Sequence, residues 1–285
     1  MSTPHRTAVI GLGSMGFGIA TSCLAAGHTT FGYDIAPAAM DRFRSDGGAE
    51  GALAEIAPTL DTVIVVVLNA AQTETVLFGA TGVVAHLKPG AAVVACATVP
   101  PDFAREMEGR CSAHGVHYLD APISGGSVKA AQGALSVMAA GTPAAFAAAR
   151  PVLNATADTV FELGNQAGPG SAMKAVNQLL AGVHIATMAE ALTFGMTQSV
   201  APAQFVEVIS KCAGSSWMLE NRAPHIVAGD YTPHSSVNIW PKDLGIVLDI
   251  ATSAQFSAPI TTAALQQFTA AAGMGLGGED AAAVA

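Results

Sequence analysis

A lysine in an otherwise uncharged stretch of the chain is its first candidate for chemistry. Lys174 lies in the segment GPGSAMKAVNQLL at 168–180, and it is the only formally charged residue across 163–189. The surrounding Ala, Val and Leu residues predict a helix. On a helix, Lys174, Asn177 and Gln178 fall at positions i, i+3 and i+4, so all three side chains share one face.

Two interpretations of Lys174 follow from the helix alone. A buried amine without a partner costs several kcal/mol if it stays charged, and desolvation lowers its pKa. A pKa about two to three below the ordinary lysine value would let Lys174 act as a general base near neutral pH. Alternatively, the lysine stem lies along the helix flank and the ammonium reaches water. The helix pattern does not decide between them.

A glycine-rich turn near the start of the chain predicts a phosphate site. The stretch TAVIGLGSMGFGIA has the GxGxxG pattern directly after an apolar strand and at the start of a helix. The first glycine allows a tight turn, the second lets the backbone approach a pyrophosphate, and the third lets the helix pack on the strand. Free N–H groups at a helix start attract phosphate. The predicted cofactor residues are Gly11, Leu12, Gly13, Ser14, Met15 and Gly16.

An acidic residue at the end of the next strand favours NAD as the dinucleotide. Asp34 lies 18 residues after Gly16, where a carboxylate can accept hydrogen bonds from a ribose 2′-hydroxyl and would repel a 2′-phosphate. The three residues that follow Asp34 carry no positive charge. We interpret Arg42 and Arg44 as solvated surface residues, too far along the following helix to change this preference.

The order of apolar and amphipathic segments predicts the fold class. Apolar strands separated by helices are typical of a Rossmann-like, doubly wound and mainly parallel α/β sheet. The predicted strands are Thr7–Ile10, Thr29–Tyr33, Thr62–Leu68, Ala91–Ala97 and Val116–Leu119, with two more at 134–141 and 157–163. The predicted helices of this half are Met15–Ala26, Ala36–Ser45, Asp102–His114 and Ala144–Leu153.

The pattern changes after Gly164, and only helices are predicted beyond it. One long helix starts at Gly170–Ser171, with Ser171 as its cap, and runs to about Ser199. Further helices are expected near 202–212, 215–226, 242–254 and 258–273. The sequence therefore predicts an NAD-binding domain at 1–164 and an all-helical substrate and oligomerisation domain at 165–285.

Composition limits the classes of partner. The 285 residues carry a net charge of −9 and no run of Lys or Arg, which argues against nucleic acid or an anionic membrane. The longest apolar runs, at 63–68 and 91–97, are far shorter than the ~20 residues of a membrane span. Residues 1–6 leave no room for a signal peptide before the first strand, so we expect a cytoplasmic protein.

Cysteine and histidine spacing gives no sign of a disulfide framework or a metal site. Cys23, Cys96, Cys111 and Cys212 form no CxxC pair, and we expect them to be buried, reduced thiols. No cluster of His, Cys and carboxylate residues has the spacing of metal ligands. His184, ten residues after Lys174, is interpreted as a helix-packing residue in preference to a substrate contact.

Five short motifs occur in order along the chain: GLGSMG at Gly11–Gly16, ATVP at Ala97–Pro100, DAPISGG at Asp120–Gly126, GPGSAMKAVN at Gly168–Asn177 and KDLG at Lys242–Gly245. Together they resemble the beta-hydroxyacid dehydrogenase family, which includes 3-hydroxyisobutyrate dehydrogenase, over essentially the whole chain. Two departures from the family pattern stand out: Ala97 replaces a frequent Ser, and Gln178 replaces a frequent second Asn.

The resemblance implies roles for individual residues. Lys174 would take the proton from a substrate hydroxyl while the same carbon gives a hydride to the nicotinamide, and Asn177 would hold the substrate in line. Lys242 could instead be an ordinary surface lysine, and the Ser124 loop a plain turn. The implied substrate-binding residues are Ser124, Gly125, Gly126, Asn177 and Gln178, and the further cofactor residues are Leu68, Asn69, Thr98 and Lys242.

The resemblance also implies a substrate class. The helical half is most similar to family members that oxidise L-threonate, and we expect oxidation at the 2-hydroxyl to the 2-oxo acid (2-oxo-tetronate). No residue decides between C2 and C3. Alternatives are 3-hydroxyisobutyrate dehydrogenase or tartronate semialdehyde reductase activity, or, in a different class, a non-catalytic NAD-binding sensor. The apolar second half suggests a homodimer or homotetramer.

Overall fold

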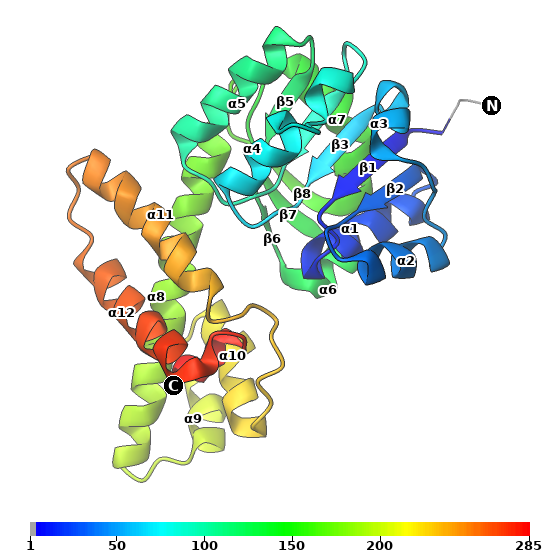
Figure 1. Ribbon diagram of the computed structural model, residues 1–285. Coiled ribbons are helices and arrows are strands. Elements are labelled where there is room, and N and C mark those ends of the chain that lie inside the picture. The colour runs from blue at the N-terminus through cyan, green and yellow to red at the C-terminus, as the bar shows by residue number, and fades with distance from the viewer. Residues whose placement is uncertain (1–3) are drawn as a thin grey trace. The chain divides into compact units, whose positions relative to one another are not determined.

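The computed structural model describes residues 4–285, and its chain contacts divide it into two units (Figure 1). The first unit ends at Lys174 and the second runs from Ala175 to Ala285. The sequence-based division at 164/165 stays a prediction. The expectation about residues 1–6 concerns in part residues 1–3, which lie outside the described range.

A five-stranded parallel sheet forms the centre of the first unit, in the order β2-β1-β3-β4-β5. Every neighbouring pair in this order is parallel. Strands β3 and β4 are buried along their whole length, as expected for Val- and Ala-rich segments covered on both faces. The predicted Rossmann-like fold class is confirmed. The strands are β1 (Arg6–Ile10), β2 (Thr29–Tyr33), β3 (Thr62–Val65), β4 (Ala92–Ala95) and β5 (His117–Asp120).

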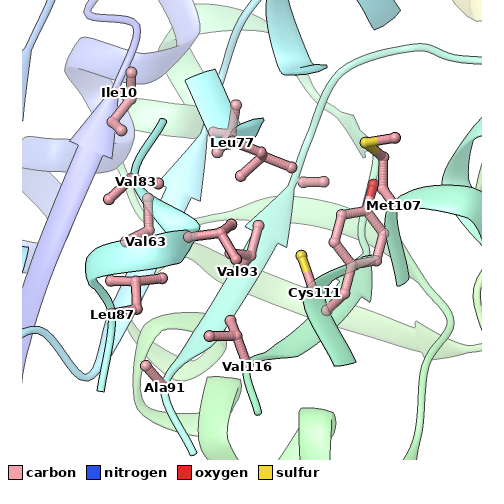
Figure 2. Close-up of a cluster of buried hydrophobic side chains, with 14 of the residues drawn as sticks. Ile10, Val63, Leu77, Val83, Leu87, Ala91, Val93, Met107, Cys111 and Val116 are labelled. Atoms are coloured by element: carbon pink, nitrogen blue, oxygen red, sulfur yellow. The ribbon is translucent and has the colours of Figure 1, made fainter. Parts of the chain in front are cut away.

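Helices α4 and α5 cover one face of this sheet. Alternate strand residues such as Ile10, Val63 and Val93 point into a core that also holds Leu77 and Met107 from these helices (Figure 2). Alternation of side chains along a strand sends the intervening residues to the opposite face. The elements on this side are α3 (Leu53–Ile56), α4 (Ala70–Phe78) and α5 (Pro101–Ala113), with short 3-10 turns η1 (Ala57–Thr59) and η2 (Val84–His86).

A second core fills the opposite face of the sheet. Val9, Ile64 and Val94 point into it and meet Ile19 of α1 and Phe146 of α7. The helices on this side are α1 (Ser14–Ala25), α2 (Pro37–Ser45), α6 (Gly126–Ala131) and α7 (Pro143–Thr156).

The last strands of the first unit form a separate sheet in the order β6-β7-β8. The segments predicted at 134–141 and 157–163 are strands, but they pair with each other and with β6 and do not extend the main sheet. An isolated antiparallel bridge between Asp120 and Ala140 connects the two sheets. The bounds are β6 (Ile123–Ser124), β7 (Leu135–Ala139) and β8 (Ala157–Glu162).

The second unit is built from helices. Ile185, Leu192, Trp240, Leu244 and Phe268 are buried in its core, with the Trp240 and Phe268 rings stacked 5.5 Å apart. Its helices are the second part of α8 (Pro169–Thr197), then α9 (Pro202–Ile209), α10 (Trp217–Ala228), α11 (Ile239–Ser253) and α12 (Pro259–Ala271), followed by short turns η3 (Ala272–Leu276) and η4 (Ala281–Val284).

Helix α8 is long and apolar enough, by length and composition, to cross a membrane. Core helices of globular proteins meet the same criterion, and α8 contributes Ile185, Met188 and Leu192 to the core of the second unit. We therefore assign α8 as a core helix.

Several boundaries differ from the prediction. Helices α4 and α6 were not predicted, because α6 is only six residues long and α4 follows the strand after one short turn. The strand predicted to end at Leu68 ends at Val65, and Asn69 caps α4 through its side chain. Ser171, predicted as the cap of α8, lies inside this helix, which begins at Pro169.

The cysteines only partly match the expectation. All four are free, but Cys212 is exposed, so its predicted burial is wrong. Burial raises the pKa of Cys23, Cys96 and Cys111 to about 12 in each case. These three thiols are therefore poor nucleophiles at neutral pH.

Candidate cofactor site and candidate active site

Most of the predicted cofactor residues follow the strands of the parallel sheet at their carboxyl ends. The glycine loop follows β1, Asp34 follows β2, Asn69 comes after β3, and Thr98 comes after β4. The carboxyl ends of parallel strands lie at one edge of a sheet, which is where such folds bind ligands. The first unit therefore gathers these residues at one edge.

The three glycines of the loop have different spatial reasons to lack a side chain. A Cβ on Gly11, which has a φ of +97°, would lie 2.2 Å from the Val66 carbonyl oxygen, and a Cβ on Gly16 would lie 1.8 Å from the Gly11 carbonyl oxygen. A Cβ on Gly13 would meet nothing within 4 Å. Gly11 and Gly16 are thus required by the fold, whereas the space beside Gly13 suits a bound group.

The start of helix α1 suits a phosphate. Gly13 is the N-cap residue and has no side chain with which to cap the helix, so the first N–H groups are available to an anion. Leu12 is buried, and Ser14 is exposed at the first position of the helix while Met15 is half-buried. This geometry fits the pyrophosphate of a dinucleotide.

Backbone groups fix the orientation of the Asp34 carboxylate. Its Oδ2 accepts a hydrogen bond from the Leu12 N–H at 2.6 Å, and its Oδ1 accepts one from the Ala36 N–H at 2.9 Å. Each oxygen keeps a further lone pair, so the carboxylate can still accept from a ribose hydroxyl. The same contact joins Asp34 to the glycine loop.

Arg42 lies closer to the loop than its position along the sequence suggested. Its guanidinium lies 4.0 Å from the centre of the Phe17 ring, and it lines a groove of about 520 Å³ together with Gly13 and Ser14. Arg42 is exposed, as expected for a solvated surface residue, and its lack of effect on the choice between NAD and NADP stays a prediction. Stacking on Phe17 holds the cation in this groove.

The other predicted cofactor residues of the first unit have local roles as well. The Leu68 N–H donates to Gln72 Oε1 at 2.9 Å, and Asn69 Oδ1 accepts from the Gln72 N–H at 2.9 Å. The Leu68 side chain is 60% exposed, which leaves an apolar surface beside the strand ends. Thr98 is half-buried in the turn between β4 and α5.

Lys174 is buried, in contrast to the alternative in which its ammonium reaches water along the helix flank. The residue is 9% exposed, and its Nζ donates a hydrogen bond to the Ile123 carbonyl oxygen at 2.8 Å. Ile123 immediately precedes Ser124, Gly125 and Gly126 in the chain. The structure thus brings the predicted catalytic amine against the segment predicted to bind the substrate.

The Ser124 segment has the backbone shape of an anion cradle. Gly125 and Gly126 have φ values of +139° and +77°, a region that favours glycine, and Gly125 is the N-cap residue of α6. Ser124 lies half-buried at the end of β6. A hydroxyl and backbone N–H groups in this arrangement can bind a carboxylate.

Asp120, a buried residue to which the sequence analysis gave no role, anchors the start of helix α8. Its Oδ2 accepts from the N–H groups of Gly168 and Ser171, both at 2.9 Å, and its Oδ1 accepts from Ser171 Oγ at 2.6 Å. Gly170 allows this close approach, since a Cβ there would lie 2.7 Å from the Asp120 carbonyl oxygen. The anchor lies one turn before Lys174. The DAPISGG motif was the available signal for this residue.

Burial raises the pKa of Asp120, although the hydrogen bonds from Ser171 and from the helix N–H groups oppose this effect. A carboxyl group whose pKa is higher in the folded state than in the unfolded state stabilises the fold most at low pH. This contribution is lost as the pH rises above the unfolded value of 3.8.

We therefore expect Asp120→Asn to keep or raise the free energy of unfolding at neutral pH. The asparagine oxygen can accept both backbone N–H groups, and its amide can donate to Ser171 Oγ. Asp120→Ala leaves two buried N–H groups unpaired and should cost roughly 3 kcal/mol. Urea unfolding of the three proteins from pH 4 to pH 8 measures this. A strong loss of stability in Asp120→Asn at pH 7 would contradict it.

The remaining predicted residues lie in the second unit and form a network of their own. Asn177 Nδ2 donates to Gln178 Oε1 at 3.0 Å, and Gln178 Nε2 donates to Asp243 Oδ2 at 2.5 Å. Lys242 Nζ lies 2.6 Å from Asp243 Oδ1. Asp243 was quoted only as part of the KDLG motif, and its burial could not be seen in the sequence.

Two further expectations concern histidine and metal. His184 is half-buried on α8 in the second unit. Across residues 4–285, no group of three or more His, Cys, Asp or Glu side chains could hold a metal ion. The candidate chemistry of the first unit is therefore built from Lys174, the Ser124 segment and the glycine loop.

Two family models together match nearly the whole chain. One, described as the NAD binding domain of 6-phosphogluconate dehydrogenase, matches residues 6–164. The other, described as NAD-binding of NADP-dependent 3-hydroxyisobutyrate dehydrogenase, matches residues 168–285.

Individual relatives are similar over almost their full length. An L-threonate dehydrogenase of Cupriavidus necator is 49% identical over 97% of this chain and 93% of its own length, and one of Escherichia coli K12 is 45% identical over 97% and 92%. The crystal structure of a 3-hydroxyisobutyrate dehydrogenase from Salmonella typhimurium is 44% identical, with a TM-score of 0.92 over 98% of each chain.

Proposed function

Because the chain belongs to the 3-hydroxyisobutyrate dehydrogenase family of NAD(P)-dependent hydroxyacid dehydrogenases, we propose that it oxidises L-threonate at the 2-hydroxyl to the 2-oxo acid. The relatives named L-threonate dehydrogenase, at 44–49% identity, support this substrate. The observation that carries the mechanism is the burial of Lys174 against the carbonyl group that precedes Ser124.

In the proposed mechanism, Lys174 moves the proton. Its neutral amine accepts the proton of the substrate hydroxyl, and in the reverse direction its ammonium returns the proton to the developing alkoxide. The Ile123 carbonyl oxygen, 2.8 Å from Nζ, accepts one amine hydrogen and so orients the nitrogen. Asn177 lies three residues further along α8 and would hold the substrate in line with the amine.

The cofactor would bind at the glycine loop and the strand ends. Bound NAD supplies the acceptor of the substrate hydride. The start of α1 would hold its pyrophosphate, Asp34 the adenine-side ribose, and Thr98 the nicotinamide side. Asp34 favours NAD over NADP because its carboxylate would repel a 2′-phosphate. Arg42 in the neighbouring groove is the cation that could weaken this preference.

The Ser124 segment would bind the substrate carboxylate. Gly125 and Gly126 have positive φ values, a conformation in which backbone N–H groups can face an anion, and the adjacent Lys174 adds positive charge when it is protonated. A carboxylate held at this segment would keep the neighbouring 2-hydroxyl near the amine. This arrangement favours oxidation at C2.

Initial rates of NADH formation test the proposed function. We expect the highest kcat/KM with L-threonate among L-threonate, D-glycerate, 3-hydroxyisobutyrate and L-serine, and a higher rate with NAD than with NADP. Faster oxidation of 3-hydroxyisobutyrate, or of glycerate to tartronate semialdehyde, would show that this acid and not L-threonate is the preferred substrate. If NAD binds but none of the four acids reduces it to NADH, the alternative of a non-catalytic NAD-binding sensor would be favoured.

The helical unit supports a homodimer or homotetramer. Several large apolar residues of α8 are more than 50% exposed in the second unit, including Val176, Phe194 and Met196. Such residues along one helix are typical of a surface covered by another subunit.

A further inference from the structure

The buried network of the second unit fixes the direction of its hydrogen bonds. Asp243 is 2% exposed and Gln178 is 7% exposed. A carboxylate only accepts hydrogen bonds, and the Lys242 ammonium lies 2.6 Å from Asp243 Oδ1. Gln178 must therefore turn its NH₂ group towards Asp243, as the 2.5 Å contact with Nε2 shows.

The orientation of the Gln178 amide in turn fixes the orientation of the Asn177 amide. Because the NH₂ group of Gln178 donates to Asp243, its Oε1 faces Asn177. Asn177 Nδ2 donates to this oxygen at 3.0 Å. The Asn177 amide is therefore held with its NH₂ group towards Gln178. Its Oδ1 and its second Nδ2 hydrogen remain for a ligand, since within residues 4–285 the Gln178 contact is the only hydrogen bond of this half-buried side chain.

We infer that Asn177 recognises two neighbouring hydroxyl groups of the substrate and that Asp243, acting through Gln178, is the positioning residue that sets this preference. The second Nδ2 hydrogen donates to the oxygen of the reacting carbon. This oxygen gives its own proton to Lys174, so it needs a donor and cannot also donate to Asn177. Asn177 Oδ1 accepts from the hydroxyl of the adjacent carbon.

The inference rests on the proposed function and narrows its substrate class. A 2-hydroxy acid with a hydroxyl on C3 can use both ends of the Asn177 amide. An acid without the C3 hydroxyl leaves Oδ1 unpaired, and a site built for a hydroxyl discriminates against an analogue that lacks it. L-Threonate has this vicinal diol, and its 3-deoxy analogue, a 2,4-dihydroxybutanoate of the same C2 configuration, does not.

The test is the ratio of kcat/KM for L-threonate to kcat/KM for the 3-deoxy analogue. Asp243→Asn removes the charge at nearly constant volume and lets an amide N–H face Gln178, so the orientation of Gln178 and Asn177 is no longer fixed. We expect the ratio to fall roughly ten-fold, the size of one neutral hydrogen bond. The matched control is Asp249→Asn, an exposed aspartate on the same helix α11, which should leave the ratio unchanged.

A second variant protects the test against misfolding. Gln178→Met keeps the length of the side chain but cannot join Asp243 to Asn177, and it should lower the ratio as Asp243→Asn does. If kcat/KM falls equally for both substrates, so that the ratio is unchanged, Asp243 has a merely structural role. This result would overturn the inference but not the proposed function. A wild-type protein that oxidises neither acid would reject the proposed function and the inference with it.

Discussion

Replacing Lys174 with alanine should lower kcat for L-threonate by about 10²–10⁴, the usual contribution of a positioned general base. The variant loses the only group proposed to accept the hydroxyl proton, while the glycine loop and Asp34 are unchanged. The dissociation constant for NAD, measured by fluorescence titration, should therefore stay near that of the wild type. Stopped-flow measurement of NADH formation gives the rate of the chemical step directly.

Two controls separate proton transfer from structural damage. Lys211→Ala removes an exposed lysine and should leave kcat unchanged. Small primary amines added to Lys174→Ala should restore part of the rate, because they can occupy the space left by the side chain. Turnover of Lys174→Ala within a few-fold of wild type would show that another group is the base.

Two neighbouring glycines should respond to the same substitution in opposite ways. Gly16→Ala places a Cβ 1.8 Å from the Gly11 carbonyl oxygen, so backbone must move, and we expect a loss of about 3 kcal/mol or more in the free energy of unfolding. Gly13→Ala meets nothing within 4 Å and should leave the free energy of unfolding without cofactor nearly unchanged.

Gly13→Ala should lower the affinity for NAD, although it leaves the free energy of unfolding nearly unchanged. A methyl group there blocks the approach of the pyrophosphate to the start of α1, and we expect NAD to bind roughly ten- to a hundred-fold more weakly, the range of one charge-assisted hydrogen bond. Urea unfolding and NAD titration of both variants measure the two effects. Unchanged NAD affinity in Gly13→Ala would show that the dinucleotide does not bind at this loop.

The sequence was sufficient for the fold class and for the local shape of the glycine loop. The apolar strands, the glycine spacing and Asp34 are properties of neighbouring residues, and the structure has the corresponding sheet and helix. The pairing of β7 and β8 in a separate sheet could not be predicted, because the choice of partner strand depends on the three-dimensional path of the chain and not on the residues of each strand alone.

In the candidate site, too, some features could be predicted from neighbouring residues and others depend on the fold. The type and spacing of Lys174 and Asn177 can be read from the chain, but their partners Ile123 and Gln178 depend on how the chain folds. The stacking of Arg42 on Phe17 likewise joins two helices that are separated in sequence. Buried carboxylates such as Asp120 look like any surface acid until their surroundings are known.

Helix α8 carries both Lys174 and Asn177 without interruption. Each residue turns an α-helix by about 100° and advances it by about 1.5 Å. Adding or deleting one residue between the two positions would swing the amide a quarter-turn or more away from the amine. We therefore expect that side chains along that interval can change during evolution, whereas a change in the interval's length would separate the two groups that the proposed mechanism needs together.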